Sequence, residues 1–88
     1  MIERTVTIKN RVGLHARPAA ELVKLTGGFD SDIKITKDDL TVDGKSIMGI
    51  MMLAAECGSS VGLRIEGSDE NEAMQAVADF LESDTEAE

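Results

Sequence analysis

The sequence is poor in aromatic residues, cysteine and proline. Its 88 residues include no tryptophan, no tyrosine, one proline and one cysteine, and the aromatic residues are Phe29 and Phe80. Proteins that bind single-stranded nucleic acid stack the bases on aromatic side chains, and this chain offers no such platform. A lone Cys57 cannot form an intramolecular disulfide, which indicates a reducing compartment. We expect Cys57 to be a partly buried thiol without a partner.

Long apolar runs are also missing. The longest one, Ile47 to Ala55, is too short to cross a bilayer. Met1 leads directly into an alternating segment rather than into a signal peptide. We therefore expect a cytoplasmic protein without membrane insertion, and the length fits a single domain.

Basic residues are absent from the C-terminal quarter of the chain. The net charge is −8, from nine Lys and Arg against 17 Asp and Glu, and residues 66–88 hold nine of the acids. Residues 1–65 therefore carry a net charge of +1, and residues 1–24 a net charge of +3. A globally acidic chain argues against nucleic acid or an anionic membrane as a partner. The basic N-terminal segment still favours an acidic protein surface or a phosphate.

Hydrophobic periodicity predicts the order β-α-β-β-α-β-α. Apolar and polar residues alternate in four strands, which include residues 2–8, 33–35, 40–42 and 61–65. Because each strand has one polar face, we expect an α+β domain with an antiparallel sheet and three helices on its other face. The domain is expected to cover residues 1–82, and residues 83–88 form an acidic tail that frays.

Apolar stripes and helix-ending residues predict the three helices. The first covers residues 16–26 and the second residues 47–56, which Gly58 follows as a stop. Ser68 or Asp69 is the candidate N-cap for the third helix, and Glu72 stands at capping-box spacing from Asp69.

His15 is the only histidine, and it stands at the start of the first predicted helix. The first N–H groups of a helix, such as that of Ala16, lack intrahelical partners and attract anions. Arg17 adds a guanidinium that suits phosphate. The helix end disfavours an imidazolium by about 0.3–1 kcal/mol, so we expect His15 to be neutral and nucleophilic near pH 7. The same groups would then stabilise a phosphoryl group on the imidazole.

Ser46 and the apolar residues after it form a second candidate site. As a helix N-cap, Ser46 needs no further role. The alternative is a regulatory phosphosite, where a phosphate adds about −1.5 to −2 charges. The helix that follows is apolar almost all round, and a domain this small cannot bury every side of it. Some of Ile47, Met48 and Met51 are therefore expected to be exposed as a patch for a partner.

No pattern in the sequence predicts a metal or a cofactor. One histidine without a cluster of cysteines or carboxylates at ligand spacing is a poor metal site. A small phosphate-binding hydrolase is disfavoured, because the chain has no general base besides His15 and little room for a deep pocket.

Two segments resemble the HPr family, the histidine-containing phosphocarriers of the bacterial phosphoenolpyruvate-dependent phosphotransferase system. Residues 13–20, GLHARPAA, resemble its phosphorylation site, and residues 44–55, GKSIMGIMMLAA, resemble its regulatory-serine segment. The two motifs are specific, and the likeness covers nearly the whole chain except the tail. It implies an open-faced β-sandwich with strand order 1-4-2-3 and three helices on one face.

The resemblance also implies a function. His15 would take phosphate at Nδ1 from the phosphorylated first enzyme of the system and pass it to a histidine of a IIA-type protein. Arg17 and the backbone N–H of Ala16 would stabilise the phosphoryl group, and Ser46 would be the target of a serine kinase/phosphorylase. The chain would be a monomeric carrier rather than an independent catalyst. The implied docking surface comprises Ala20, Lys24, Ile47, Met48, Met51 and Met52.

Val12 departs from the family, in which many members have Ser, Thr or Asn that reaches the phosphoryl group. More of the stabilisation must then fall on backbone N–H groups and Arg17. Residues 10–13 are closer to the nitrogen-related branch than to the sugar-transport branch, so both branches remain open. A second function also remains open: a regulatory binding module that acts through Ser46 and its apolar patch without transfer through His15.

Overall fold

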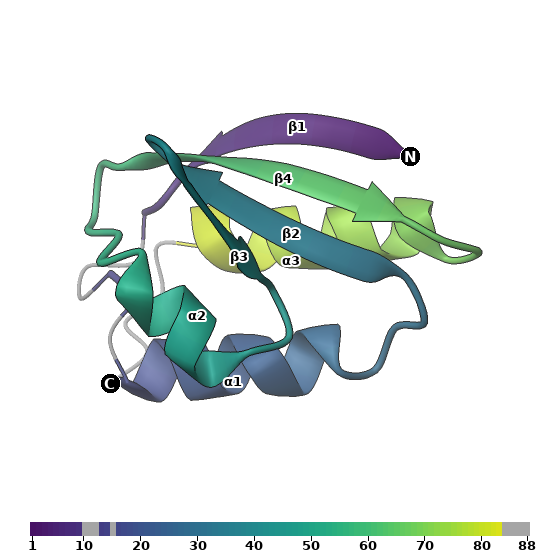
Figure 1. Ribbon diagram of the computed structural model, residues 1–88, viewed down its shortest axis with the longest axis horizontal. Helices are drawn as coiled ribbons and strands as arrows, with labels where there is room; N and C mark the ends of the chain where they lie inside the picture. The colour runs from purple at the N-terminus through teal and green to yellow at the C-terminus, as the bar shows by residue number, and fades with distance from the viewer. Residues whose placement is uncertain (10–12, 15, 84–88) are drawn as a thin grey trace.

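The computed structural model describes residues 1–9, 13–14 and 16–83. These ranges hold the strands β1 (Ile2–Thr7), β2 (Asp32–Lys37), β3 (Leu40–Asp43) and β4 (Ser60–Glu66), and the helices α1 (Ala16–Thr26), α2 (Ile47–Met52) and α3 (Glu70–Glu82). The strands form one antiparallel sheet in the order β1-β4-β2-β3, and the helices lie on one side of it (Figure 1). The fold implied by the resemblance is confirmed. Among the described residues, no helix is long and apolar enough to span a membrane.

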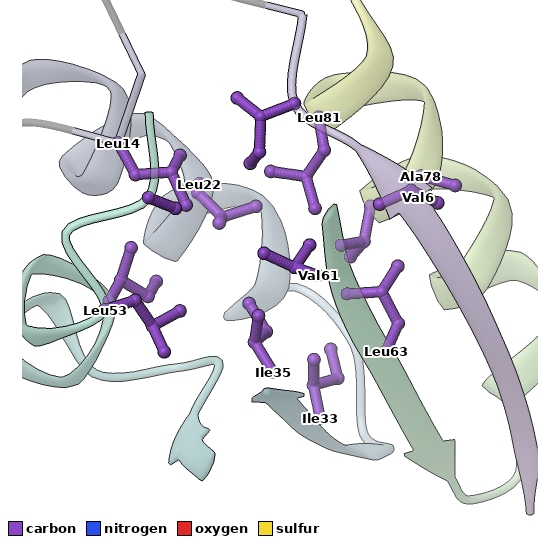
Figure 2. Close-up of a cluster of buried hydrophobic side chains, with 14 of the residues drawn as sticks. Val6, Leu14, Leu22, Ile33, Ile35, Leu53, Val61, Leu63, Ala78 and Leu81 are labelled. Carbon is purple, nitrogen blue, oxygen red and sulfur yellow. The ribbon is translucent and has the colours of Figure 1, made fainter. Parts of the chain in front are cut away.

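The core lies between the sheet and the helices. β4 buries every second side chain, Val61, Leu63 and Ile65, and β2 does the same with two isoleucines. Figure 2 shows Val61 and Leu63 of β4 and both isoleucines of β2 in one cluster with Leu22 of α1 and Leu81 of α3. Burying each large aliphatic side chain contributes about 1.5–3 kcal/mol, so this layer holds the helices on the sheet. The opposite face of the sheet carries polar side chains, and none of the described helices covers it (Figure 1).

The second helix is shorter than the sequence predicts. α2 ends at Met52, with Leu53 as its C-cap, rather than near residue 56. Ala54 adopts a left-handed φ of 51° and ends the helix well before Gly58. Glycine is the usual residue in the left-handed conformation that ends a helix, and here that residue is an alanine. The sequence therefore does not show where α2 ends. Cys57 consequently lies in the loop before β4 and is exposed, which corrects the expectation of a partly buried thiol.

The start of α3 also differs from the prediction. Asp69 is the N-cap, but its side chain makes no cap hydrogen bond, so the capping box with Glu72 is wrong. The Asp69 carboxylate instead accepts hydrogen bonds from the Ser31 hydroxyl and, at 2.9 Å each, from the N–H groups of Asp30 and Ser31. These bonds, that from the Ser31 hydroxyl first, hold the pKa of Asp69 below its usual value. The Asp69 carboxylate thus bonds to Asp30 and Ser31, which are distant in sequence, instead of capping the first turn of α3.

Candidate functional site

The first helix begins directly after His15 in the sequence, at Ala16. His15 and residues 10–12, which include Val12, lie outside the described residues. Ala16 and Arg17 occupy the first turn of α1 and are exposed, whereas Pro18 is buried. The amides that open α1 therefore belong to exposed residues, which directly follow the predicted nucleophile His15 in the sequence.

The segment before α1 is anchored to the segment after α2. The Leu14 N–H donates to the Ala55 carbonyl at 2.8 Å, and the Leu14 side chain is buried. Gly13 has a φ of 68°, and a Cβ there would lie 2.7 Å from the Ala55 oxygen and 2.9 Å from Glu56 Cα. Only glycine fits this approach. The contact brings the two segments that carry the sequence motifs together at the end of α2.

A small hollow of about 150 Å³ lies at this junction. It is lined by Leu14, Met51, Ala54, Ala55 and Glu56. Of these residues, only Met51 was predicted from the sequence as a site residue. Gly13 was the one sign of this junction in the sequence, because a glycine in a loop indicates an unusual φ or a close backbone approach. It does not tell which segment makes that approach.

Ser46 is the N-cap of α2, as predicted, and it is half-buried. Its Oγ accepts a hydrogen bond from the Gly49 N–H at 3.1 Å. Neighbouring groups tie this turn to the end of α1: Lys45 Nζ donates to the Phe29 carbonyl at 2.8 Å, and Thr26 Oγ1 donates to the Gly44 carbonyl at 2.9 Å. The serine therefore sits on a turn with a defined position relative to α1.

All but one of the large apolar side chains of α2 are exposed, and they include the three that the sequence predicts, Ile47, Met48 and Met51. Ile50 is buried, and the exposed fractions of the others are 43% for Ile47, 73% for Met48, 43% for Met51 and 63% for Met52. We call these four residues the α2 patch. α1 packs beside α2 (Figure 1) and contributes an exposed Lys24 and a half-buried Ala20. An exposed apolar patch of this kind is a suitable contact surface for another protein.

Comparison with known proteins gives consistent matches. The family model for the PTS HPr component phosphorylation site matches residues 2–83. The phosphocarrier protein HPr of Cupriavidus necator is 52% identical over 77 residues, which cover 88% of this chain and 86% of that protein. The crystal structure of a phosphocarrier protein HPr from Bacillus anthracis matches with a TM-score of 0.90 and 44% identity, over 92% of this chain and 96% of that one. Crh from Bacillus subtilis, whose structure is described as a domain-swapped dimer, matches with a TM-score of 0.75 and 41% identity, over 92% and 93%.

Proposed function

The chain belongs to the HPr family of phosphocarriers of the phosphotransferase system, and from that premise we propose that it relays phosphoryl groups through His15. The observation that carries the proposal is the exposed N-terminus of α1, which begins directly after His15 and holds Arg17 in its first turn. The donor is the phosphorylated first enzyme of the system, and the acceptor is a IIA-type protein. The chain acts in the cytoplasm as a carrier rather than as an independent catalyst, and it needs no cofactor.

Transfer to the carrier is a substitution at phosphorus. The lone pair of Nδ1 on neutral His15 forms a P–N bond while the bond between phosphorus and the donor histidine breaks, and the donor nitrogen keeps that electron pair. The Ala16 N–H and the Arg17 guanidinium stabilise the charged phosphoryl oxygens. Because the Val12 side chain has no hydrogen-bonding group, these two groups carry more of the stabilisation than in relatives with a polar side chain there.

The test uses the full chain with the first enzyme and phosphoenolpyruvate. We expect one phosphoryl group per chain, lost in acid and kept in base, and onward transfer to a IIA-type protein. His15→Ala should incorporate none, and continued incorporation of acid-labile phosphate by this variant refutes the proposal. Arg17→Ala should fold normally and transfer roughly 100-fold more slowly, as expected on losing one preorganised donor. A full transfer rate in that variant contradicts the role of Arg17.

Partner docking is assigned to the α2 patch together with Ala20 and Lys24. Support comes from the exposure of the patch and from the packing of α2 beside α1. Ser46 at the start of α2 is proposed as a regulatory phosphosite for a serine kinase/phosphorylase, since a phosphate there places charge next to Ile47 and Met48. Mass spectrometry after incubation with such a kinase and ATP should find an acid-stable phosphate on Ser46 and none on Ser46→Ala.

The likeness to Crh favours a second candidate, a regulatory binding module that acts through Ser46 and the α2 patch. Val12 is compatible with it, because a chain that does not transfer phosphate needs no polar side chain there. Rapid cycling of phosphate between His15 and a IIA-type acceptor excludes this candidate. We propose a monomer, as suits a carrier that moves between partners, and sedimentation of the full chain distinguishes it from a dimer like that described for Crh.

A further inference from the structure

The open face of the sheet, opposite the helices, contains a second hollow. Its volume is about 360 Å³, and its lining includes Thr5, Lys34, Thr36, Gly62 and Arg64. Pockets for small ligands have volumes of about 300–1,000 Å³, so this one is large enough for a small molecule. None of these residues belongs to α1 or α2, where phosphoryl transfer and docking are proposed.

Strand register arranges the lining in two rows across the sheet. Thr5 stands opposite Gly62, Gly62 opposite Thr36, and Thr36 opposite Thr41, which forms a row of hydroxyl groups with one gap. The Oγ1 atoms of Thr36 and Thr41 are 2.8 Å apart. The adjacent row has the order Glu3, Arg64, Lys34 and Asp43, so its two cations occupy the central strands.

Gly62 creates the gap, and packing does not demand a glycine there. Among the described residues, a Cβ at Gly62 would meet only Thr36 Cβ, at 4.0 Å, and Gly62 has no left-handed φ. Gly44 differs, because its Cβ would lie 2.6 Å from Ile33 Cγ2. A glycine inside a strand weakens the strand, and it often marks a place where a ligand comes close. A side chain at position 62 would therefore be compatible with the fold, but it would fill the hollow.

Two of the cations that line the hollow, Arg64 and Lys34, pair with exposed carboxylates, and the third, Arg4, pairs with Glu82 at 3.7 Å. Arg64 Nε donates to Glu3 at 3.1 Å, with both side chains about 60% exposed. Lys34 Nζ lies 3.6 Å from Asp32. Such pairs contribute little to stability and exchange readily for a better anion. A phosphate offers Arg64 a bidentate partner and can also accept from Lys34 and from threonine hydroxyls.

We propose that this hollow binds a small phosphate monoester that carries hydroxyl groups. Its phosphate contacts Arg64 and Lys34, and its hydroxyl-bearing part lies over Gly62 among Thr5, Thr36 and Thr41. A small molecule fits better than a peptide strand, because strands add to the edges of a sheet rather than to its face. The site acts independently of transfer through His15.

The first test is a titration of the ¹⁵N-labelled full chain, followed by NMR. Glucose 6-phosphate is the probe, with glucose and inorganic phosphate as comparisons. We expect saturable shifts at the amides of Thr5, Thr36, Gly62 and Arg64, with a dissociation constant of about 1 mM or below, and weaker binding of both comparisons. Three results would overturn the proposal: no saturable shift at these amides, shifts centred on α1, or equal affinity for inorganic phosphate.

Substitutions separate the hollow from the general charge of the chain. Gly62→Thr should keep the fold, fill the hollow and weaken glucose 6-phosphate binding roughly tenfold or more, since it excludes the sugar. Lys34→Gln should weaken binding by a similar factor. Glu3→Gln should strengthen it, because this change frees Arg64 and removes a repelling carboxylate.

Two matched controls complete the set. Glu72→Gln, the same charge change on an exposed position of α3, should leave binding unchanged. Ser60→Ala, at the end of β4 and outside the hollow, should do so as well. Unchanged affinity of a folded Gly62→Thr variant contradicts the proposed site. So does an equal gain in affinity from Glu3→Gln and Glu72→Gln.

Discussion

Thr26 is a polar residue inside the apolar core, at the last position of α1. Its hydroxyl donates to the Gly44 carbonyl at 2.9 Å, a contact that fixes the end of α1 to the turn before α2. A buried hydroxyl of this kind contributes chiefly because its removal leaves an acceptor unsatisfied. One side chain therefore helps to set the position of the Ser46 turn.

Thr26→Val keeps the shape of the side chain and removes the donor. We expect the free energy of unfolding, measured with urea, to fall by about 1–2 kcal/mol. Thr41→Val is the matched control, because its hydroxyl bonds at an exposed position and its loss should change stability by no more than about 0.5 kcal/mol. Equal losses in the two variants would show that burial of the Gly44 contact is unimportant.

Asp69 makes the stability of the chain depend on pH. Hydrogen bonds from the Ser31 hydroxyl and from the Asp30 and Ser31 N–H groups lower the pKa of Asp69 in the folded state. A lowered pKa means that the folded state prefers the carboxylate. The contribution is complete above the ordinary value of 3.8 and is lost as the pH falls through the lower folded value.

Asp69→Asn should therefore flatten the acid side of the stability profile. We expect the urea midpoint of the wild type to fall between pH 6 and pH 3 by more than that of the variant, which cannot ionise at this position. At pH 6 the variant should be the less stable protein. An equal fall in midpoint for both proteins would assign the acid sensitivity to other groups.

At the scale of elements, the end of α2 is the position where a backbone preference is violated. Ala54 has a φ of 51°, which costs an L-residue with a Cβ roughly 1–2 kcal/mol. The cost is tolerated because the chain must turn here to bring Ala55 to Leu14. The strained residue lies beside the candidate site, where it lines the smaller hollow.

Ala54→Gly should relieve this strain. We expect the free energy of unfolding to rise by about 0.5–1 kcal/mol, the gain on relief less the greater backbone entropy of glycine in the unfolded chain. Ala76→Gly, within α3, should lower it by about 1 kcal/mol. If thermal or urea unfolding shows the same sign of change for both variants, the left-handed conformation of Ala54 is not a source of strain.

Elements with a clear period were predictable from sequence, and their tertiary partners were not. Alternation in β2 and β4 and the stripe of α1 identified all three, because burial on one face leaves a local pattern. Asp69 was assigned to a local cap, yet its carboxylate bonds residues in the loop before β2. Likewise the motif predicted Arg17 and Ser46 as site residues, whereas Glu56 enters the junction only through a contact that the fold creates.

At the scale of the molecule, charge is distributed unevenly. Nine of the 17 acids fall in residues 66–88, and the chain carries a net charge of −8. A further negative charge therefore changes the overall field little, but it changes a docking surface strongly if it lies there. A negative charge introduced at Ser46 should therefore act on docking through its position rather than through the net charge.

Ser46→Asp should weaken binding of the first enzyme about tenfold, because the charge adjoins Ile47 and Met48 of the α2 patch. Ser60→Asp adds the same charge at an exposed end of β4, and its affinity should stay within about twofold of the wild type. Calorimetry at two salt concentrations measures both. Similar losses in the two variants would mean that net charge, rather than the α2 patch, controls docking.

The pairing of β1 with β4 has a consequence for the newborn chain. β1 lies at an edge of the sheet, and among the described strands it pairs with β4 alone, where Ile2 stands opposite Ile65. Ribosomes add about 5–20 residues per second, so roughly 3–12 seconds pass between the synthesis of β1 and that of the last residue of β4. During that interval Val6 has no partner strand, and the native sheet is completed only after β4 has been synthesised.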